Sequence, residues 1–337
     1  MPEATTDDHQ RLAKVRLHVV TGKGGTGKTT VAAALALALT RQGKRVLLAE
    51  VEGRQGISQT FDVAPLGHTE TRILHDRTGG ELWGLSVDAK ESLLEYLQKF
   101  YKLGRAGSVL ERFGAIDFAT TIAPGVRDVL LIGKVYEAAG RRTGRSGGPA
   151  YDTVILDAPP TGRVVRFLNV NAEVADVARM GPIRSQADSI TRMLRSHTTA
   201  VHVVTLLEEM PVQETVDALA DLRAASLPVG AIVVNQLRVP LLTDRALKAV
   251  AARSTTKLRA GVRADLVAAG VKATDPLVAG LLADGREHAD RVALEREQDA
   301  LLVALGRRMV RLPLLAEGTD TGGIAVLAAQ VAEQGMV

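Results

Sequence analysis

Val19-Val20-Thr21-Gly22-Lys23-Gly24-Gly25-Thr26-Gly27-Lys28-Thr29-Thr30 is the stretch that decides the fold of this chain. From Gly22 to Thr29 it fits the pattern G-x-x-x-x-G-K-[ST], the phosphate-binding loop or P-loop. A strand-like segment at residues 15–20 precedes the loop, and a strongly helix-forming segment follows it from Val31 to the closing Gly43. Strand, glycine loop and helix are the context that the motif needs. The stretch therefore predicts an α/β fold of the P-loop type.

The loop also predicts the ligand. Glycines let backbone N–H groups turn inward around phosphate oxygens, and the N-terminus of the following helix adds partial positive charge. We expect Lys28 to reach the β- and γ-phosphates and the Thr29 hydroxyl to ligate Mg²⁺. This chemistry is that of a nucleoside triphosphate bound with magnesium.

A dinucleotide site is the alternative on the same residues. Gly22, Gly24 and Gly27 also satisfy G-x-G-x-x-G, and the acids Glu50 and Glu52 follow the next apolar segment. Glycine-rich loops satisfy that pattern easily, however, and a dinucleotide has no use for the Lys28-Thr29 pair. We therefore favour the triphosphate and keep an NAD-linked oxidoreductase as the weakest alternative.

Lys23 is the unusual residue of the loop. A second lysine this early cannot easily serve phosphates that its own loop already surrounds. It resembles the deviant P-loop G-K-G-G-x-G-K-[ST], in which this lysine reaches across a dimer interface into the nucleotide of the partner. The alternative is an ordinary exposed lysine.

Composition limits the other possibilities. The chain has 337 residues, which suits two domains or one large α/β domain with insertions. It is 46% apolar but only 3% aromatic, so the core is built from Ala, Val and Leu. The absence of cysteine excludes disulfides and thiolate metal sites. The net charge of +4 is scattered, and nucleic-acid binding is not expected.

The domain prediction is a disordered segment at residues 1–13 and a single domain at 14–337. Helical insertions are expected around residues 88–150, 171–198 and 241–305. The N-terminus lacks the features of a signal peptide and no apolar run is long enough to span a bilayer, so we expect a cytoplasmic protein. Residues 324–337 hold no Lys or Arg, which argues against a basic amphipathic membrane anchor.

A second decisive segment ends at Asp157. Residues 153–156 form a buried-type strand, and an aspartate at its end is the Walker B arrangement, expected to meet Mg²⁺ through Thr29 or a water. The loop at residues 159–162 is placed to sense the γ-phosphate and to change conformation on hydrolysis. Glu50 ends the strand expected at 44–50 and Glu52 follows it. At this end of the strand a carboxylate could orient the attacking water or hold Mg²⁺ through water; the alternative is a solvated loop.

Two later strands are expected near the base of the nucleotide. Residues 229–236 form the first, and the donor and acceptor groups of Asn235 could read the Watson–Crick edge of a base. Residues 310–315 form the last strand, and the loop at 316–323 would lie over the base. His202 lies within a strand without a second ligand at metal spacing, so we interpret it as a core histidine or an ordinary strand residue.

Taken together, these segments resemble the ArsA family of anion-pump and tail-anchored-protein targeting ATPases over about residues 14–330. The segments 50–57, 118–125 and 157–163 are most similar to actinobacterial ArsA-like ATPases, which are thought to pair with a sister subunit. The resemblance implies a doubly wound, mostly parallel sheet flanked by helices, and two subunits facing each other across two ATP molecules. It implies catalytic roles for Lys23, Lys28 and Glu52, metal ligation by Thr29 and Asp157, and nucleotide contacts by Gly22, Lys23, Gly24, Gly25, Thr26, Gly27, Lys28, Thr29, Thr30, Asn235, Pro313 and Leu315.

The chain departs from the family at four points. Glu52 stands where the family has a water-positioning aspartate. The cysteine pairs that hold zinc at a dimer interface and the cysteines that bind arsenite are absent, and so are methionine-rich client helices. We expect a Mg²⁺- and ATP-dependent dimer, with itself or a sister subunit, that acts on an unknown client protein. The alternative is a weakly hydrolysing regulatory subunit of a heterodimer.

Overall fold

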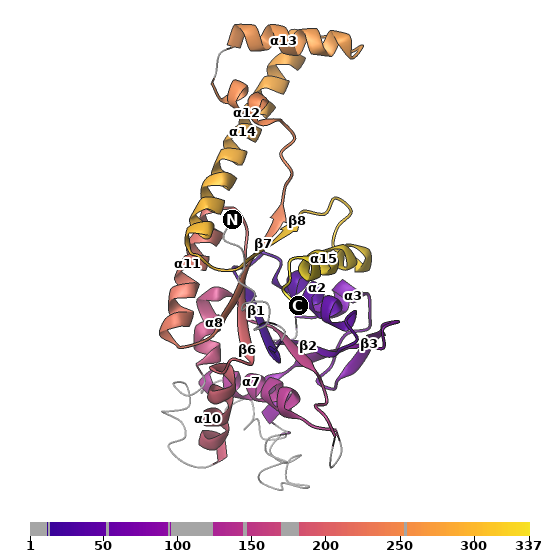
Figure 1. Cartoon of the computed structure of the whole chain (residues 1–337), viewed down its shortest axis with the longest axis vertical. Helices are drawn as coiled ribbons and strands as arrows, with labels where there is room; N and C mark the ends of the chain where they lie inside the picture. Colours follow the sequence, from indigo (N-terminus) through magenta and orange to yellow (C-terminus); the bar gives the residue numbers. More distant parts are fainter. Residues whose placement is uncertain are drawn as a thin grey trace.

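The computed structural model describes residues 12, 14–51, 54–93, 95, 124–143, 147–169, 182–252 and 255–337. Within these ranges, eight strands form one sheet in the order β3-β4-β2-β5-β1-β6-β7-β8 (Figure 1). The strands are β1 (Leu17–Gly22), β2 (Arg45–Val51), β3 (Thr71–His75), β4 (Glu81–Val87), β5 (Thr153–Asp157), β6 (Thr199–Thr205), β7 (Val229–Leu237) and β8 (Met309–Pro313). The helices are α2 (Lys28–Thr40), α3 (Gly56–Phe61), α7 (Pro124–Gly140), α8 (Thr161–Leu168), α10 (Pro182–Leu194), α11 (Glu209–Ala224), α12 (Asp244–Ala251), α13 (Thr255–Ala268), α14 (Asp275–Ala304) and α15 (Thr321–Glu333).

The sheet is parallel except at one edge, which confirms the predicted fold class. All neighbouring strands pair in parallel apart from β3, which runs antiparallel to β4. Strand β3 was not predicted, because its side chains are exposed or half-buried and it lacks the continuous apolar run of an inner strand.

Helices cover both faces of the sheet because its inner strands are apolar on both sides. On β2, Leu47 and Ala49 point to the face covered by α7, α8, α10 and α11, whereas Val46 and Leu48 point to the face covered by α2 and α15. Helix α2 is buried almost all round, and α15 packs against it (Figure 1). An all-apolar helix needs this second cover.

Strand β1 occupies the middle of the sheet, between β5 and β6. The chain proceeds from β1 to one side through β2, β4 and β5, and then crosses to the other side through β6, β7 and β8. The carboxyl end of β1 is thus the point where the strand order reverses. Ligands of open α/β sheets bind in the crevice at such points.

Helices α12, α13 and α14 form an arm that extends away from the sheet (Figure 1). Helix α14 is 30 residues long; its C-terminal part packs beside α11, and α12 packs along it through a small separate apolar cluster that includes Leu247, Val250 and Val292. The arm falls in the third range expected to hold a helical insertion. The other two ranges contain α7 and α10, but residues 96–123 and 170–181 lie outside the described residues. The division into domains stays a prediction.

His202 is a core residue, as predicted. It is fully buried in β6, and its Nδ1 accepts a hydrogen bond of 3.0 Å from the backbone N–H of Ala231. Its Nε2 lies 2.9 Å from Nδ1 of His18 on the neighbouring strand, so Nε2 donates this bond. Burial lowers the pKa of His202 to about 3. The imidazole pair is therefore neutral and serves to satisfy buried polar atoms.

Candidate active site

The P-loop joins the carboxyl end of β1 to the start of α2, and its conformation requires glycine at two positions. A Cβ atom on Gly22 would lie 2.2 Å from the carbonyl oxygen of Val204. Gly27 has a φ of 85°, and its Cβ would lie 2.4 Å from the side-chain nitrogen of Asn235. By contrast, a Cβ on Gly24 or Gly25 would meet no atom within 4 Å. These two glycines therefore leave open space at the outer side of the loop, where a phosphate chain could approach the backbone.

The Lys28 side chain lies inside this loop. The residue is 8% exposed, and its Nζ donates a hydrogen bond of 3.0 Å to the backbone carbonyl of Lys23. Burial lowers the pKa of Lys28, while the nearby Asp157 acts in the opposite direction. A buried ammonium held by one neutral carbonyl lacks a full set of anionic partners. Phosphate oxygens would supply them.

Thr29 and Asp157 meet although they are far apart in the sequence. The Thr29 hydroxyl donates a hydrogen bond of 2.5 Å to Oδ2 of Asp157. The other carboxylate oxygen, Oδ1, is buried without a hydrogen-bond partner. Burial raises the pKa of Asp157, and the Thr29 hydrogen bond partly opposes this effect. A hydroxyl beside an unsatisfied carboxylate oxygen is a donor set that suits Mg²⁺, so the residues present fit this ion.

Glu50 holds the loop after β2 in place. It is 1% exposed, and its two carboxylate oxygens accept hydrogen bonds from the backbone N–H groups of Gln55 (2.8 Å) and Ile57 (3.2 Å). The solvated loop considered as an alternative is therefore wrong for Glu50, and each of its oxygens already accepts one backbone hydrogen bond. Its role in orienting a water or in holding Mg²⁺ through water stays a prediction. The bonds place the start of α3 against the P-loop, because a Cβ on Gly56 would lie 3.0 Å from Cγ2 of Thr29. Glu52 lies outside the described residues.

Asn235 lies at the end of β7, directly behind the P-loop. It is 4% exposed, and its side-chain nitrogen donates a hydrogen bond of 2.9 Å to the backbone carbonyl of Thr26. This amide therefore supports the loop, which the sequence analysis did not predict. Its contact with a base stays a prediction.

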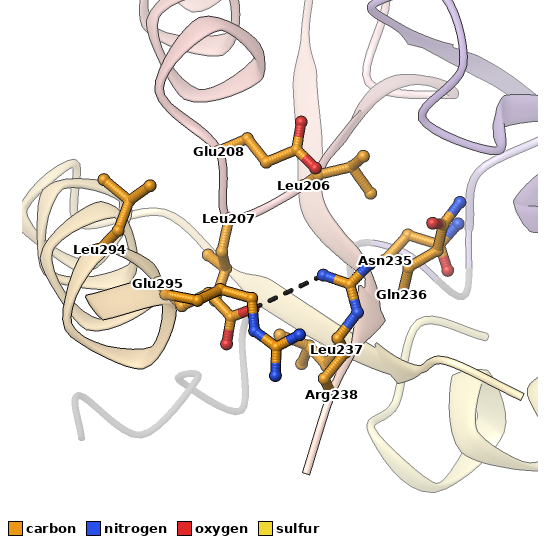
Figure 2. A pocket seen from close by; sticks show the side chains of 10 residues that line it. Leu206, Leu207, Glu208, Asn235, Gln236, Leu237, Arg238, Leu294 and Glu295 are labelled. Carbon is orange, nitrogen blue, oxygen red and sulfur yellow. Dashed lines mark ion pairs between the residues drawn. The ribbon is translucent and has the colours of Figure 1, made fainter. Parts of the chain in front are cut away.

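A cavity of about 120 Å³ opens beside Asn235, between the carboxyl ends of β6 and β7 and helix α14 (Figure 2). Glu295 lies on its α14 side and pairs with Arg238 at 3.7 Å and with Arg291 at 3.6 Å. The complete lining is Leu206, Leu207, Glu208, Asn235, Gln236, Leu237, Arg238, Arg291, Leu294 and Glu295.

Pro313 and Leu315 lie next to the same edge of the sheet. Pro313 ends β8 opposite Leu237 of β7, and the backbone N–H of Leu314 donates a hydrogen bond of 2.8 Å to the carbonyl of Leu237. Leu315 packs against the core shared by α2 and α15. Both residues are half-buried. Contacts between these side chains and a nucleotide stay predictions, and so do those of Thr30, which is half-buried in the first turn of α2.

Lys23 forms an ion pair that the sequence analysis did not predict. Its Nζ donates to Oε1 of Glu214, which lies on α11. The other oxygen of Glu214 accepts a hydrogen bond of 2.9 Å from the hydroxyl of Thr161, the first residue of α8. No sequence signal marks Glu214, because an acid within a helix is common and belongs to no motif.

Within the described residues, none of the helices is both long and apolar enough to cross a membrane.

Comparisons with known proteins all identify ATPases as similar to this chain. The family model described as anion-transporting ATPase, ArsA, matches residues 15–197. "ATPase BagA" of Mycobacterium tuberculosis is 47% identical over 326 residues, which cover 97% of this chain and 95% of that protein. "Putative arsenical pump-driving ATPase 2" of Aquifex aeolicus is 30% identical over 157 residues, which cover 46% of this chain and 48% of that protein.

Proposed function

This chain belongs to the ArsA family of ATPases, and from that membership we propose that it is a Mg²⁺-dependent dimeric ATPase whose loop movements act on a partner protein. The contact between Thr29 and Asp157 carries the proposal. It places a hydroxyl and an unsatisfied carboxylate oxygen at the carboxyl ends of β1 and β5, at the start of a P-loop helix. ATP would lie along the loop, and a bound Mg²⁺ would neutralise charge on the phosphates.

Each loop residue has a distinct task in this proposal. Backbone N–H groups of residues 24–29 and the N-terminus of α2 would bind phosphate oxygens. The ammonium of Lys28 would exchange the carbonyl of Lys23 for the β- and γ-phosphates and would stabilise charge that develops on hydrolysis. Thr29 and Asp157 would hold the metal ion. Glu52 is the residue that we propose to orient the attacking water.

The loop after Asp157 is built to transmit a change at the site. The backbone N–H of Ala158 donates to the carbonyl of Val20 at 2.9 Å, and the Thr21 hydroxyl donates to the carbonyl of Pro159 at 2.7 Å. Helix α8 starts two residues after Pro159. A shift of Asp157 on binding or hydrolysis would therefore pass along this short loop to α8, and it would strain the two hydrogen bonds that tie the loop to β1.

Dimerisation is proposed because of Lys23. In the deviant P-loop that the sequence resembles, this lysine acts on the nucleotide of a second subunit. The second subunit would be another copy of this chain or a sister ATPase. The dimer would act in the cytoplasm. A weakly hydrolysing regulatory subunit is the alternative, since Glu52 replaces an aspartate and its longer side chain changes where the carboxylate lies.

The ATPase rate per protomer, measured against protein concentration for this chain alone, tests the proposal. We expect a rate that rises with concentration and that disappears in Lys28→Ala together with tight ATP binding. Lys248→Ala is the matched control, because Lys248 is an exposed lysine on α12. Near-normal ATP affinity in Lys28→Ala would refute the assignment of the loop. Tight ATP binding without turnover at any concentration would favour the regulatory alternative.

A further inference from the structure

Glu214 connects two loops of the site that are distant in the sequence. One carboxylate oxygen pairs with the ammonium of Lys23 in the P-loop, and the other accepts the hydroxyl of Thr161, which follows the Asp157 loop. The side chains of Lys23 and Glu214 are about one-third exposed, at 31% and 35%. The hydrogen bond from Lys23 lowers the pKa of Glu214, so the carboxylate is charged at neutral pH.

The backbone of Lys23 is fixed independently of its side chain. Its carbonyl oxygen accepts the hydroxyl of Thr26 at 2.9 Å and the ammonium of Lys28 at 3.0 Å. When Lys28 turns to the phosphates, the Thr26 hydroxyl still holds this carbonyl, so the four-carbon side chain of Lys23 can rotate while the loop keeps its shape. From this one backbone position, the ammonium can pair with the carboxylate of its own protomer. After the side chain rotates, it can pair with an anion outside that protomer.

We propose that Glu214 is a positioning residue that holds Lys23 within its own protomer and releases it when Thr161 moves. This inference rests on the proposed function, since the released lysine is the one that would serve a second nucleotide. The contact is a latch: while it is closed, the ammonium that the neighbouring site needs is neutralised by a carboxylate on α11.

The second oxygen of Glu214 supplies the trigger. Thr161 begins α8 and lies four residues after Asp157, so a movement of the Asp157 loop displaces the hydroxyl that steadies the carboxylate. Loss of that hydrogen bond leaves Lys23 as the hydrogen-bond partner of Glu214, with the charge of Lys28 nearby. An ion pair that is one-third exposed is then weak enough to exchange for a more highly charged phosphate.

Amine labelling measures the latch without any need for turnover. The full-length protein is acetylated with an N-hydroxysuccinimide ester without nucleotide, and the labelling of Lys23 is followed by peptide mass spectrometry relative to the exposed Lys248. Since exposed ion pairs shift equilibria by up to about fivefold, Glu214→Gln should speed the labelling of Lys23 by about that factor. Glu209→Gln, an exposed glutamate on the same helix, should leave it unchanged.

Thr161→Val provides a second variant that keeps the ion pair and removes only the hydroxyl. It should raise the labelling of Lys23 by a smaller factor than Glu214→Gln does. Equal labelling of Lys23 in the wild type and in both variants would overturn the latch.

The dependence of the ATPase rate on protein concentration then distinguishes a latch role of Glu214 from a purely structural one. Glu214→Gln should lower the protein concentration at half-maximal ATPase rate about fivefold, the same factor that the exposed ion pair permits. Because Lys23→Ala removes the lysine that turnover needs, the double variant is read by ATP-dependent dimerisation in analytical ultracentrifugation, where Glu214→Gln should lower the midpoint concentration only when Lys23 is present. A shift that persists without Lys23 would show that Glu214 acts through another contact and would overturn the proposal. A wild type that hydrolyses nothing at any concentration would show that this chain alone forms no active dimer, and the labelling would still decide the latch.

Discussion

Three glycines of the P-loop differ in backbone strain and in the space beside them. Replacing each by alanine should therefore lower the free energy of unfolding by different amounts. Gly24 has open space beside it and no left-handed φ, so Gly24→Ala should leave the free energy of unfolding nearly unchanged. Gly25 has a φ of 86° and open space, so Gly25→Ala meets only the left-handed penalty. Gly27 combines a φ of 85° with a Cβ position 2.4 Å from the Asn235 nitrogen.

The magnitudes follow from these differences. A left-handed alanine costs about 1–2 kcal/mol relative to glycine, and the stiffer unfolded chain returns about 0.5 kcal/mol. Gly25→Ala should therefore cost about 1 kcal/mol. Gly27→Ala adds an overpacked contact worth about 1–3 kcal/mol, for a total of about 2–4 kcal/mol. It should also weaken ATP binding, because Asn235 must leave the carbonyl of Thr26.

Urea unfolding of the three variants, followed by far-UV circular dichroism, checks the series. The order of stability should be Gly24→Ala, then Gly25→Ala, then Gly27→Ala as the least stable. Combining Gly27→Ala with Asn235→Ala should cost less than the sum of the two single changes, since the contact is removed. If Gly27→Ala proves no less stable than Gly25→Ala, the assigned contact with Asn235 is refuted.

Two further predictions concern buried carboxylates. Because the folded-state pKa of Asp157 is raised, its carboxyl stabilises the fold below its unfolded pKa, and this contribution is lost as pH rises through the higher folded value. Asp157→Asn should therefore raise the urea midpoint at pH 8 but not at pH 3. In the same variant, Mg²⁺ should no longer strengthen ATP binding. A difference in urea midpoint between variant and wild type that is the same at both pH values would contradict the stability prediction. Glu50→Gln should cost about 1.5–3 kcal/mol, since one backbone N–H loses a charged acceptor. Glu287→Gln on the exposed side of α14 is its control, and equal urea midpoints for the two variants would argue against the anchoring role.

Local sequence patterns located two segments of the site. The P-loop from Gly22 to Thr29 and the strand that ends at Asp157 were located correctly because each is a short-range signal with a physical cause. Glycines are needed where backbone approaches backbone, and a buried parallel strand is a continuous apolar run. Edge strand β3 was missed because it carries no such run. The anchoring role of Glu50 and the support of the P-loop by Asn235 were missed because a side chain's partner is not encoded in its own segment.

The amino-acid sequence by itself determined that a P-loop follows an apolar strand, that a carboxylate ends another buried-type strand, and that no thiol chemistry is available. The tertiary structure alone decided which side chains meet. Thr29 contacts Asp157 across 128 residues of chain, Lys23 contacts Glu214 across 191, and Asn235 contacts Thr26 across 209. Such contacts depend on strand order, because parallel strands bring their carboxyl ends to one edge whatever their separation in the sequence.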